Sequence, residues 1–355
     1  MQKTISSFRM PKIVTFGEVM MRLTPPNLAR LSQTTSFDIT FGGGEANVAM
    51  SLADFGFEAA HVTRFPDHAL GHRAARFLRE RGLDISTILF GGNRIGTYYL
   101  EEGASLRASQ IVYDRQFSAF SEIQPGMIDW DQVLTEPSGA PARWFHWAGI
   151  TPALSQGCAD ACLEAVQAAK RLGVRVSGDI FYRANLWQYG KTPQEIIPEL
   201  TRHTDLVNAS KGVLDLLFGF TSTDFTDACR QLQAAFPSVQ WVADTNRIQH
   251  SATHNDLSAT LWNGQTLLQT PTFTIDPIID RIGGGDAFVA GLIYGLTRFN
   301  DRSADGAAFR TEQQALTFAV AASALKHTIS GDANDCSVAE VEAIASGQTS
   351  GRIKR

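Results

Sequence analysis

The stretch that decides the fold covers residues 277–294 and reads PIIDRIGGGDAFVAGLIY. The apolar pair Ile278 and Ile279 predicts a short strand, the glycines at 283–285 predict a turn, and the apolar residues after Asp286 predict a helix. Glycine lets a backbone approach a ligand closely, and the free N–H groups of a helix start attract anions. Asp286 either caps this helix or accepts a proton from a substrate. Taken alone the motif favours the cap, because Asp is a common capping residue.

A second glycine triplet, at 42–44, also precedes a predicted helix, which ends at Gly56. Glu45 lies in the first turn of that helix, where the helix dipole favours a carboxylate. Asn47 can hydrogen-bond a ligand hydroxyl or satisfy the local backbone. A close approach to a ligand and a plain tight turn are equally compatible with this stretch, because glycine serves both.

Outward from these motifs, short apolar strands alternate with amphipathic helices. Residues 12–17 (KIVTFG) read as a strand, residues 70–81 as a helix stopped by a glycine, and residues 239–243 as a strand that ends at Asp244 and Arg247. This alternation predicts a mostly parallel α/β sheet.

The pattern changes between residues 93 and 120, where alternating polar and apolar residues predict a hairpin without a long helix. Together with residues 20–42, this segment is expected to form a small separate sheet that covers the main body. The side chains of Tyr113 and Arg115 should share one face of a strand, since side chains alternate along it. We therefore expect one domain over residues 12–345, with this β-lid inserted and tails at 1–11 and 346–355.

Composition narrows the class of partner. The 355 residues are 44% hydrophobic and 19% charged, which is ordinary for a globular protein with a large core. A net charge of −5 provides no basic field for nucleic acid or an anionic membrane. The four cysteines lack the spacing of a metal site, and no signal peptide or run of about 18 apolar residues is found. A soluble cytoplasmic protein without nucleic-acid or membrane partners is expected.

Two common nucleotide-binding patterns are missing. The first strand lacks the G-x-G-x-x-G of a dinucleotide-binding fold, and no G-x-x-x-x-G-K-[ST] loop occurs. Of the enzyme classes compared, this leaves phosphoryl transfer by a site that has no P-loop lysine. In such a site the N–H groups of a helix start neutralise phosphate charge while a carboxylate activates the acceptor hydroxyl.

The segments GGGEANVA (42–49) and DRIGGGDAFVAG (280–291) resemble, in order and separation, the two signatures of the PfkB or ribokinase-like carbohydrate kinases. The resemblance covers residues 12–345. It implies an α/β, ribokinase-like three-layer fold, with a mostly parallel central sheet flanked by helices and a small β-sheet lid. It also implies ATP and Mg²⁺ as cofactors and a homodimer formed through the lid. A monovalent cation near the loop that precedes residue 286 is left open.

Within that family the sequence is most similar to 2-keto-3-deoxygluconate (KDG) kinases. The similarity rests on FGEVMMRLTPP (16–26), AGITPALS (148–155) and GDIFYRANLW (178–187). It implies ATP-dependent phosphorylation of the primary hydroxyl of a sugar acid, KDG becoming its 6-phosphate. The alternatives are another PfkB kinase, for fructose, ribose or a nucleoside, and a non-catalytic relative that binds sugar or nucleotide.

The resemblance also implies roles for individual residues. Asp286 would be the general base, and Gly283, Gly284 and Gly285 the anion hole. The residues expected to bind the sugar are Gly43, Gly44, Asn47, Tyr98, Tyr113, Arg115, Ile150, Arg183 and Asp332. Those expected to bind nucleotide are Asn208, Arg247, Gly283 and Gly285, and no metal ligand is assigned. Two arginines favour a sugar acid over a neutral sugar, because the guanidinium fork matches a carboxylate.

Three departures from the family pattern favour the alternatives. Residues 208–211 read NASK, so that Lys211 stands where the N-x-x-E motif has Glu. Phe181 replaces the Asn of the D-x-N-Y-R pattern, and the nucleotide-side G-x-x-G is missing. The change at Lys211 bears on Mg²⁺, which offsets phosphate charge in such reactions.

Overall fold

The computed structural model describes residues 11–300 and 311–348. The tails predicted at 1–11 and 346–355 therefore lie mostly outside the described residues. Among the described helices, none is both long and apolar enough to cross a membrane.

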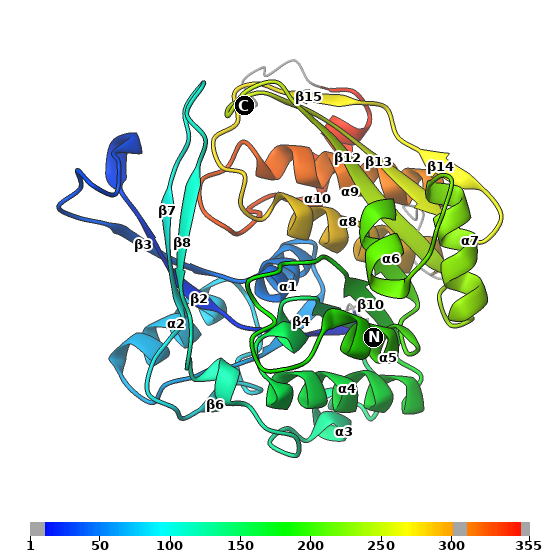
Figure 1. Ribbon diagram of the computed structural model, residues 1–355, viewed down its shortest axis with the longest axis horizontal. Helices are drawn as coiled ribbons and strands as arrows, with labels where there is room; N and C mark the ends of the chain where they lie inside the picture. Colours follow the sequence, from blue (N-terminus) through cyan, green and yellow to red (C-terminus); the bar gives the residue numbers. More distant parts are fainter. Residues whose placement is uncertain (1–10, 301–310, 349–355) are drawn as a thin grey trace, which may run out of the picture.

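A nine-stranded sheet forms the middle of the molecule (Figure 1). Six neighbouring strands pair in parallel, in the order β4 (Glu58–Val62), β1 (Lys12–Phe16), β9 (Trp144–Ala148), β10 (Arg175–Asp179), β11 (Leu206–Asn208) and β12 (Trp241–Gln249). Three antiparallel strands complete it: β13 (Asn255–Trp262) pairs with β12, and β14 (Leu267–Gln269) and β15 (Phe273–Ile275) both pair with β13. The mostly parallel sheet predicted from the sequence is confirmed.

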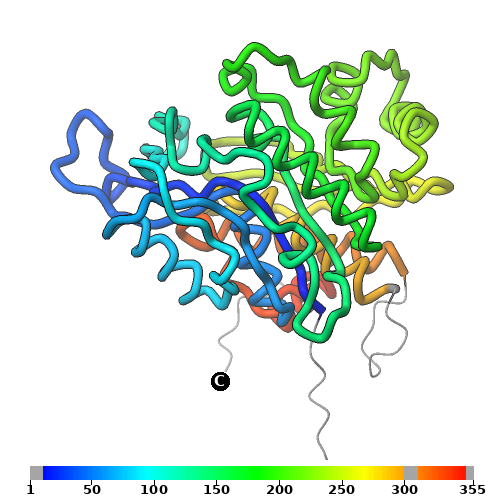
Figure 2. Tube along the Cα trace, turned by 90° about the horizontal axis from the view of Figure 1, so that it is seen from below, coloured from blue at the N-terminus to red at the C-terminus, as the bar shows by residue number. Residues whose placement is uncertain are grey.

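Helices cover both faces of this sheet because its strands are apolar on both sides (Figure 2). In β1, Ile13 belongs to one core cluster and the next residue, Val14, to the other, as the alternation of a strand requires. One face carries α3 (Trp130–Val133), α4 (Gln156–Arg171), α5 (Pro193–Thr201), α6 (Lys211–Phe218) and α7 (Phe225–Ala235). The other carries α1 (Gly44–Asp54), α8 (Gly284–Asn300), α9 (Glu312–Lys326) and α10 (Val338–Ala345), and α2 (Ala69–Glu80) packs beside α1. The expected three-layer α/β fold is confirmed.

A separate four-stranded sheet stands at one side of the body, blue and cyan in Figure 1. Its order is β3 (Asp38–Gly42), β2 (Met20–Thr24), β7 (Thr97–Glu101) and β8 (Gln110–Asp114). β2 and β7 pair in parallel, so strands from the two segments expected to form a small sheet meet at its centre. The remaining short elements are a two-stranded sheet, β5 (Arg64–Phe65) with β6 (Leu89–Phe90), and three single turns of helix, η1 (Pro26–Leu28), η2 (Phe120–Glu122) and η3 (Thr151–Ala153).

The strand predicted at Ile278 and Ile279 is wrong. Both residues lie in the loop between β15 and α8, and their backbone N–H groups donate to loop carbonyls. Ile278 donates to Thr253 at 2.7 Å, and Ile279 donates to His327 at 2.7 Å. Two apolar residues are too few for periodicity to distinguish a strand from a buried loop.

The end predicted for the strand at 239–243 is also wrong. β12 continues to Gln249, with Asp244 and Arg247 inside it, because β13 pairs with it residue by residue from Val242 to Gln249. The end of β12 is set by its pairing with β13, and the residues of β12 themselves carry no signal of where that pairing stops.

Helix α8 is held against α9 by close backbone packing. A Cβ at Gly291 would lie 2.7 Å from the Cα of Ala319, and one at Gly295 would lie 2.6 Å from the Cβ of Ala315. The small side chains of α9 therefore set the distance between α8 and α9. This distance in turn sets the position of the glycine turn at the N-terminus of α8.

Candidate active site

The carboxyl ends of the parallel strands and the first turns of α1 and α8 come together at one edge of the main sheet. Ligands gather at this edge in open α/β sheets. The link between the two helices is a hydrogen bond in which Asn47 Nδ2, in α1, donates to Asp286 Oδ2, in α8, at 2.7 Å. The two glycine motifs, more than 230 residues apart in the chain, are thereby brought to one place.

Asp286 is the third residue of α8 and not the residue that caps it. Its side chain is half-buried. Burial raises the pKa of the Asp286 carboxyl to about 7, against the opposing effect of the hydrogen bond from Asn47. Three nearby carboxyl groups add to the rise, those of Asp179, Asp332 and Glu45. A carboxylate with a pKa near neutrality is suited to accept a proton from a hydroxyl group.

The glycine turn before Asp286 depends on having no side chains. Gly283 has a φ of 82°, and a Cβ there would lie 2.0 Å from the carbonyl oxygen of Asp332. A Cβ at Gly284 would lie 2.5 Å from the imidazole of His327. Gly285, by contrast, is exposed and would have open space around a Cβ. Since the first N–H groups of a helix have no intrahelical partner, this open face can receive an anion.

The turn before α1 is equally tight. A Cβ at Gly43 would lie 2.0 Å from the carbonyl oxygen of Glu18. A Cβ at Gly44 would lie 3.6 Å from Asp286 Oδ1, so this glycine faces the base directly. Glu45 is buried and accepts hydrogen bonds from Thr151 Oγ1 at 2.6 Å and from the Ala148 N–H at 3.2 Å. Glu45 therefore connects α1 to the end of β9 by hydrogen bonds, in addition to the favourable interaction with the helix dipole that was expected from the sequence.

Arg22 is a site residue that sequence reasoning missed. Its guanidinium is only 2% exposed and pairs with Asp280 at 2.7 Å, Asp332 at 2.8 Å and Glu102 at 3.2 Å. The Tyr98 hydroxyl donates to the second oxygen of Asp332 at 2.5 Å. One feature of the sequence could have indicated Arg22. This residue alternates with Met20 and Thr24 on the buried face of β2, where a charge without a partner would be costly.

The small sheet also contributes Arg115, just after β8. Arg115 Nε donates to Glu18 Oε2 at 2.8 Å, and Ser118 donates to the other oxygen of Glu18. Glu18 therefore already balances the charge of Arg115, which weakens the sequence argument that this arginine attracts an acid. Tyr113 is 55% exposed, and its ring lies 6.0 Å from that of Tyr98. The two residues expected to share a strand face thus differ in exposure.

The loops after β9 and β10 hold two further predicted sugar contacts. Ile150 is half-buried and precedes η3, where its carbonyl accepts from the Ala153 N–H at 2.9 Å. Arg183 is exposed and lies over the ring of Phe181 at 5.2 Å. Within the described part of the chain Arg183 forms no ion pair, so its charge remains available to an acidic ligand.

The predicted nucleotide side centres on Asn208, at the end of β11. Its Nδ2 donates to Asp179 Oδ1 at 2.7 Å, while its Oδ1 is buried and has no hydrogen-bond partner among the described residues. Burial raises the pKa of Asp179 to about 6. Lys211 does not approach this pair, because its ammonium binds Asp215 at 2.7 Å one turn along α6. Arg247 is exposed on β12. Burial lowers the pKa of Arg281, which precedes the turn at 283–285 by two residues, and the charge of Arg247 lowers that pKa further.

The chain is similar to known carbohydrate kinases over almost its whole length. The family described as pfkB family carbohydrate kinase matches residues 10–339. The chain is 29% identical to a 2-dehydro-3-deoxygalactonokinase of Haloferax volcanii over 96% of this chain and 98% of that protein. The crystal structure of a 2-dehydro-3-deoxygluconokinase from Thermotoga maritima matches with a TM-score of 0.87 and 38% identity, covering 96% of this chain and 99% of that one. A PfkB family carbohydrate kinase from Listeria grayi matches with a TM-score of 0.85 and 31% identity, covering 94% and 99%.

Proposed function

Because this chain belongs to the pfkB family of carbohydrate kinases, we propose that it uses ATP to phosphorylate a sugar acid. The proposed reaction carries the γ-phosphate of ATP to the primary hydroxyl of 2-keto-3-deoxygluconate and yields the 6-phosphate and ADP. The observation that carries it is the hydrogen bond from Asn47 to Asp286, which joins the two glycine turns and orients a carboxylate of raised pKa. The names of the Haloferax and Thermotoga relatives support a sugar acid as substrate.

In the proposed mechanism Asp286 is the general base. The sugar hydroxyl oxygen attacks the γ-phosphorus, its proton passes to the Asp286 carboxylate, and the bond to the ADP oxygen breaks. Asn47 holds the carboxylate in place. The N–H groups of residues 283–285 stabilise the charge on the transferring phosphoryl group, as helix starts do for anions.

The sugar is proposed to lie between the two glycine turns and the small sheet. Gly43, Gly44 and Asn47 would contact it from α1, and Ile150 would contact it from the loop after β9. Tyr98, Tyr113, Arg115 and Asp332 would contact it from the side of the small sheet. Arg183 is the residue proposed to bind its carboxylate, since Arg115 already pairs with Glu18. This assignment narrows the earlier expectation of two arginines to one.

The nucleotide is proposed to lie along Asn208, Arg247 and the turn at 283–285. Mg²⁺ fits the donors nearby, because it prefers oxygen ligands and Asn208 Oδ1 is a buried oxygen without a partner among the residues that the structure describes. Asp179 and Asn208 would hold the ion, directly or through water, and it would neutralise charge on the phosphates. Whether a monovalent cation is required is the question left open by the sequence, and replacing K⁺ with Na⁺ in the assay tests it.

One kinase domain is proposed over residues 12–345, with 20–42 and 93–120 as its lid. The lid exposes several apolar side chains on its strands and turns: Leu28, Ile39, Leu106, Ile111, Val112 and Phe117. Exposed apolar residues on the strands and turns of the lid support a homodimer formed through this sheet. Sedimentation should therefore give twice the monomer mass for the native protein and a monomer for Val112→Lys.

The substrate is tested by an ADP-release assay with 2-keto-3-deoxygluconate, 2-keto-3-deoxygalactonate, fructose and ribose. We expect kcat/KM for one of the two sugar acids to exceed that for either neutral sugar by at least about 100-fold, since a site built for a charged group strongly rejects ligands that lack it. Asp286→Asn protein serves as the blank for contaminating kinase. A neutral sugar that is turned over as well as the acids would refute the choice of substrate and leave the kinase assignment standing.

The non-catalytic alternative rests on Lys211. The ion pair of Lys211 with Asp215 weakens it, because the lysine is drawn away from Asn208 and Asp179. Calorimetry that detects sugar binding, together with no ADP release at any Mg²⁺ concentration, would instead favour this alternative.

A further inference from the structure

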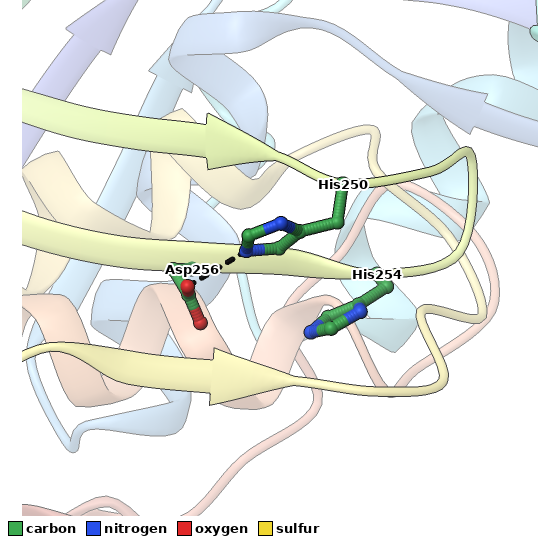
Figure 3. Close-up of side chains that lie close together, drawn as sticks. All are labelled: His250, His254 and Asp256. Carbon is green, nitrogen blue, oxygen red and sulfur yellow. Dashed lines mark hydrogen bonds and ion pairs between the residues drawn. The ribbon is translucent and has the colours of Figure 1, made fainter.

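Three side chains with metal-binding atoms, none of them proposed to bind sugar or nucleotide, lie together on the hairpin that joins β12 to β13. They are His250, His254 and Asp256, and one donor atom from each lies within 4.8 Å of the others. Figure 3 shows all three on the same side of the hairpin. We propose that they form a site for a divalent ion of the zinc class.

The hairpin register explains why the side chains converge. His250 and His254 are a cross-strand pair, in which the His250 N–H donates to the His254 carbonyl at 3.0 Å. Asp256 follows His254 by two residues, and side chains two apart on a strand share a face. The rings of His250 and His254 lie 4.4 Å apart, with their planes tilted by 37°. The backbone thus presents all three donors in one direction.

Asp256 is oriented for such a role by two hydrogen bonds. One of its oxygens lies 2.7 Å from His250 Nε2, and the other accepts from Thr274 Oγ1, in β15, at 2.7 Å. Metal ligands are commonly held by partners of this kind. Thr274 would therefore act as a positioning residue that fixes the carboxylate without binding the ion.

The donor set selects the kind of ion. Two imidazoles and one carboxylate suit Zn²⁺, Co²⁺ or Ni²⁺, whereas Mg²⁺ prefers oxygen ligands alone. Donors around a tetrahedral ion at about 2.1 Å lie roughly 3.4 Å from one another. The ion would therefore replace the direct contact between His250 and Asp256, and the His254 ring would move inward. Three protein ligands leave a coordination position for water.

The proposed site is linked by hydrogen bonds to the loop that precedes the glycine turn at 283–285. The hairpin tip accepts three hydrogen bonds from Arg281, at 2.7 Å to the Ser251 carbonyl and at 2.6 and 3.0 Å to that of Ala252. Arg281 lies two residues before Gly283. A bound ion that links β12 to β13 would make the hairpin tip more rigid, and with it the two carbonyl groups that accept the hydrogen bonds of Arg281.

The test is calorimetric titration of Zn²⁺ into the full-length protein, without a polyhistidine tag and with Mg²⁺ in excess. We expect one saturable site per chain that millimolar Mg²⁺ does not displace. His254→Ala and His250→Gln should each weaken binding at least tenfold, and Thr274→Val about tenfold, the lower end of the effect seen for such partners.

His72 supplies the matched control, because it is an exposed histidine that pairs with a single carboxylate, Asp67, at 3.0 Å. His72→Ala should bind Zn²⁺ as the native protein does. Zinc should also raise Tm in the native protein and in His72→Ala, and should not raise it in His254→Ala. Equal binding by His254→Ala and the native protein, displacement by Mg²⁺, or binding without saturation would each overturn the site.

Discussion

Burial raises the pKa of the Asp286 carboxyl and the hydrogen bond from Asn47 lowers it, and the balance between them should set the pH at which this kinase works. With a pKa of about 7, the Asp286 carboxyl is about 90% ionised at pH 8 and about 10% ionised at pH 6. Since only the ionised form accepts a proton, kcat should fall roughly tenfold between these two values. An aspartate with an ordinary pKa near 4 would give a flat profile over this range.

Replacing Asn47 with Ala removes a donor to the ionised carboxylate and leaves the proton-bound form comparatively favoured. A hydrogen bond to a charged group contributes about 1.5 kcal/mol or more, and 1.36 kcal/mol corresponds to one pKa unit. The pKa should therefore rise by about one unit, so that the acid limb of the profile moves from near pH 7 to near pH 8. At pH 6 the variant should then retain only about 1% of its own maximal kcat.

The assay is kcat against pH from 5.5 to 9, at saturating sugar and ATP, for the native protein and Asn47→Ala. Saturation removes any effect of the substitution on sugar affinity. The comparison between two proteins cancels the titration of ATP itself. An acid limb that stays at the same pH in both proteins would refute the assignment of Asp286 as the base. A native profile flat down to pH 5.5 would refute the raised pKa of its carboxyl.

Three further outcomes follow from the geometry. Asp286→Asn should lower kcat by about 10²–10⁴, the usual contribution of a general base, with sugar affinity by calorimetry within about twofold of native; near-native turnover would contradict its role. Gly283→Ala should lower the free energy of unfolding by at least about 1–3 kcal/mol in denaturant, because φ is positive and the added Cβ meets the Asp332 carbonyl. Gly285→Ala should unfold like the native protein, and equal stability of the two variants would count against the strained turn. Arg183→Ala should raise KM for the sugar acid at least tenfold and leave KM for ATP unchanged, with Arg202→Ala, another exposed arginine over a phenylalanine ring, as control; an unchanged sugar KM would remove the carboxylate contact.

The local parts of the site are those that could be predicted from the sequence. The glycine triplets and the helices behind them are contiguous in the chain, so their order and spacing indicated two ligand-facing turns. The strand–helix alternation likewise predicted the parallel sheet. The position of Asp286 inside the helix, opposite Asn47, is a tertiary fact that only the structure provides.

Contacts between distant segments could not be predicted in the same way. Arg22 meets Asp332 across 310 residues, and no periodicity links the two positions. Similarly, Glu18, in the loop between β1 and β2, neutralises Arg115, so that the charge available to a ligand differs from the charge counted in the sequence. The full length of β12 depended on its partner β13.

The buried ion pairs of Arg22 bear on how fast ligands can come and go. Swinging β2 away from the body would separate Arg22 from Asp280 and Asp332, and breaking a buried pair costs about 3–5 kcal/mol. A barrier of that height would slow such a motion by about 10²–10³-fold or more. The outer strand β8 has exposed side chains along its whole length, and a buried ion pair, that of Arg115 with Glu18, holds only its C-terminal end. Sugar and product should therefore enter and leave beside the exposed part of β8 that precedes Arg115, while these buried ion pairs hold β2 and the end of β8 in place.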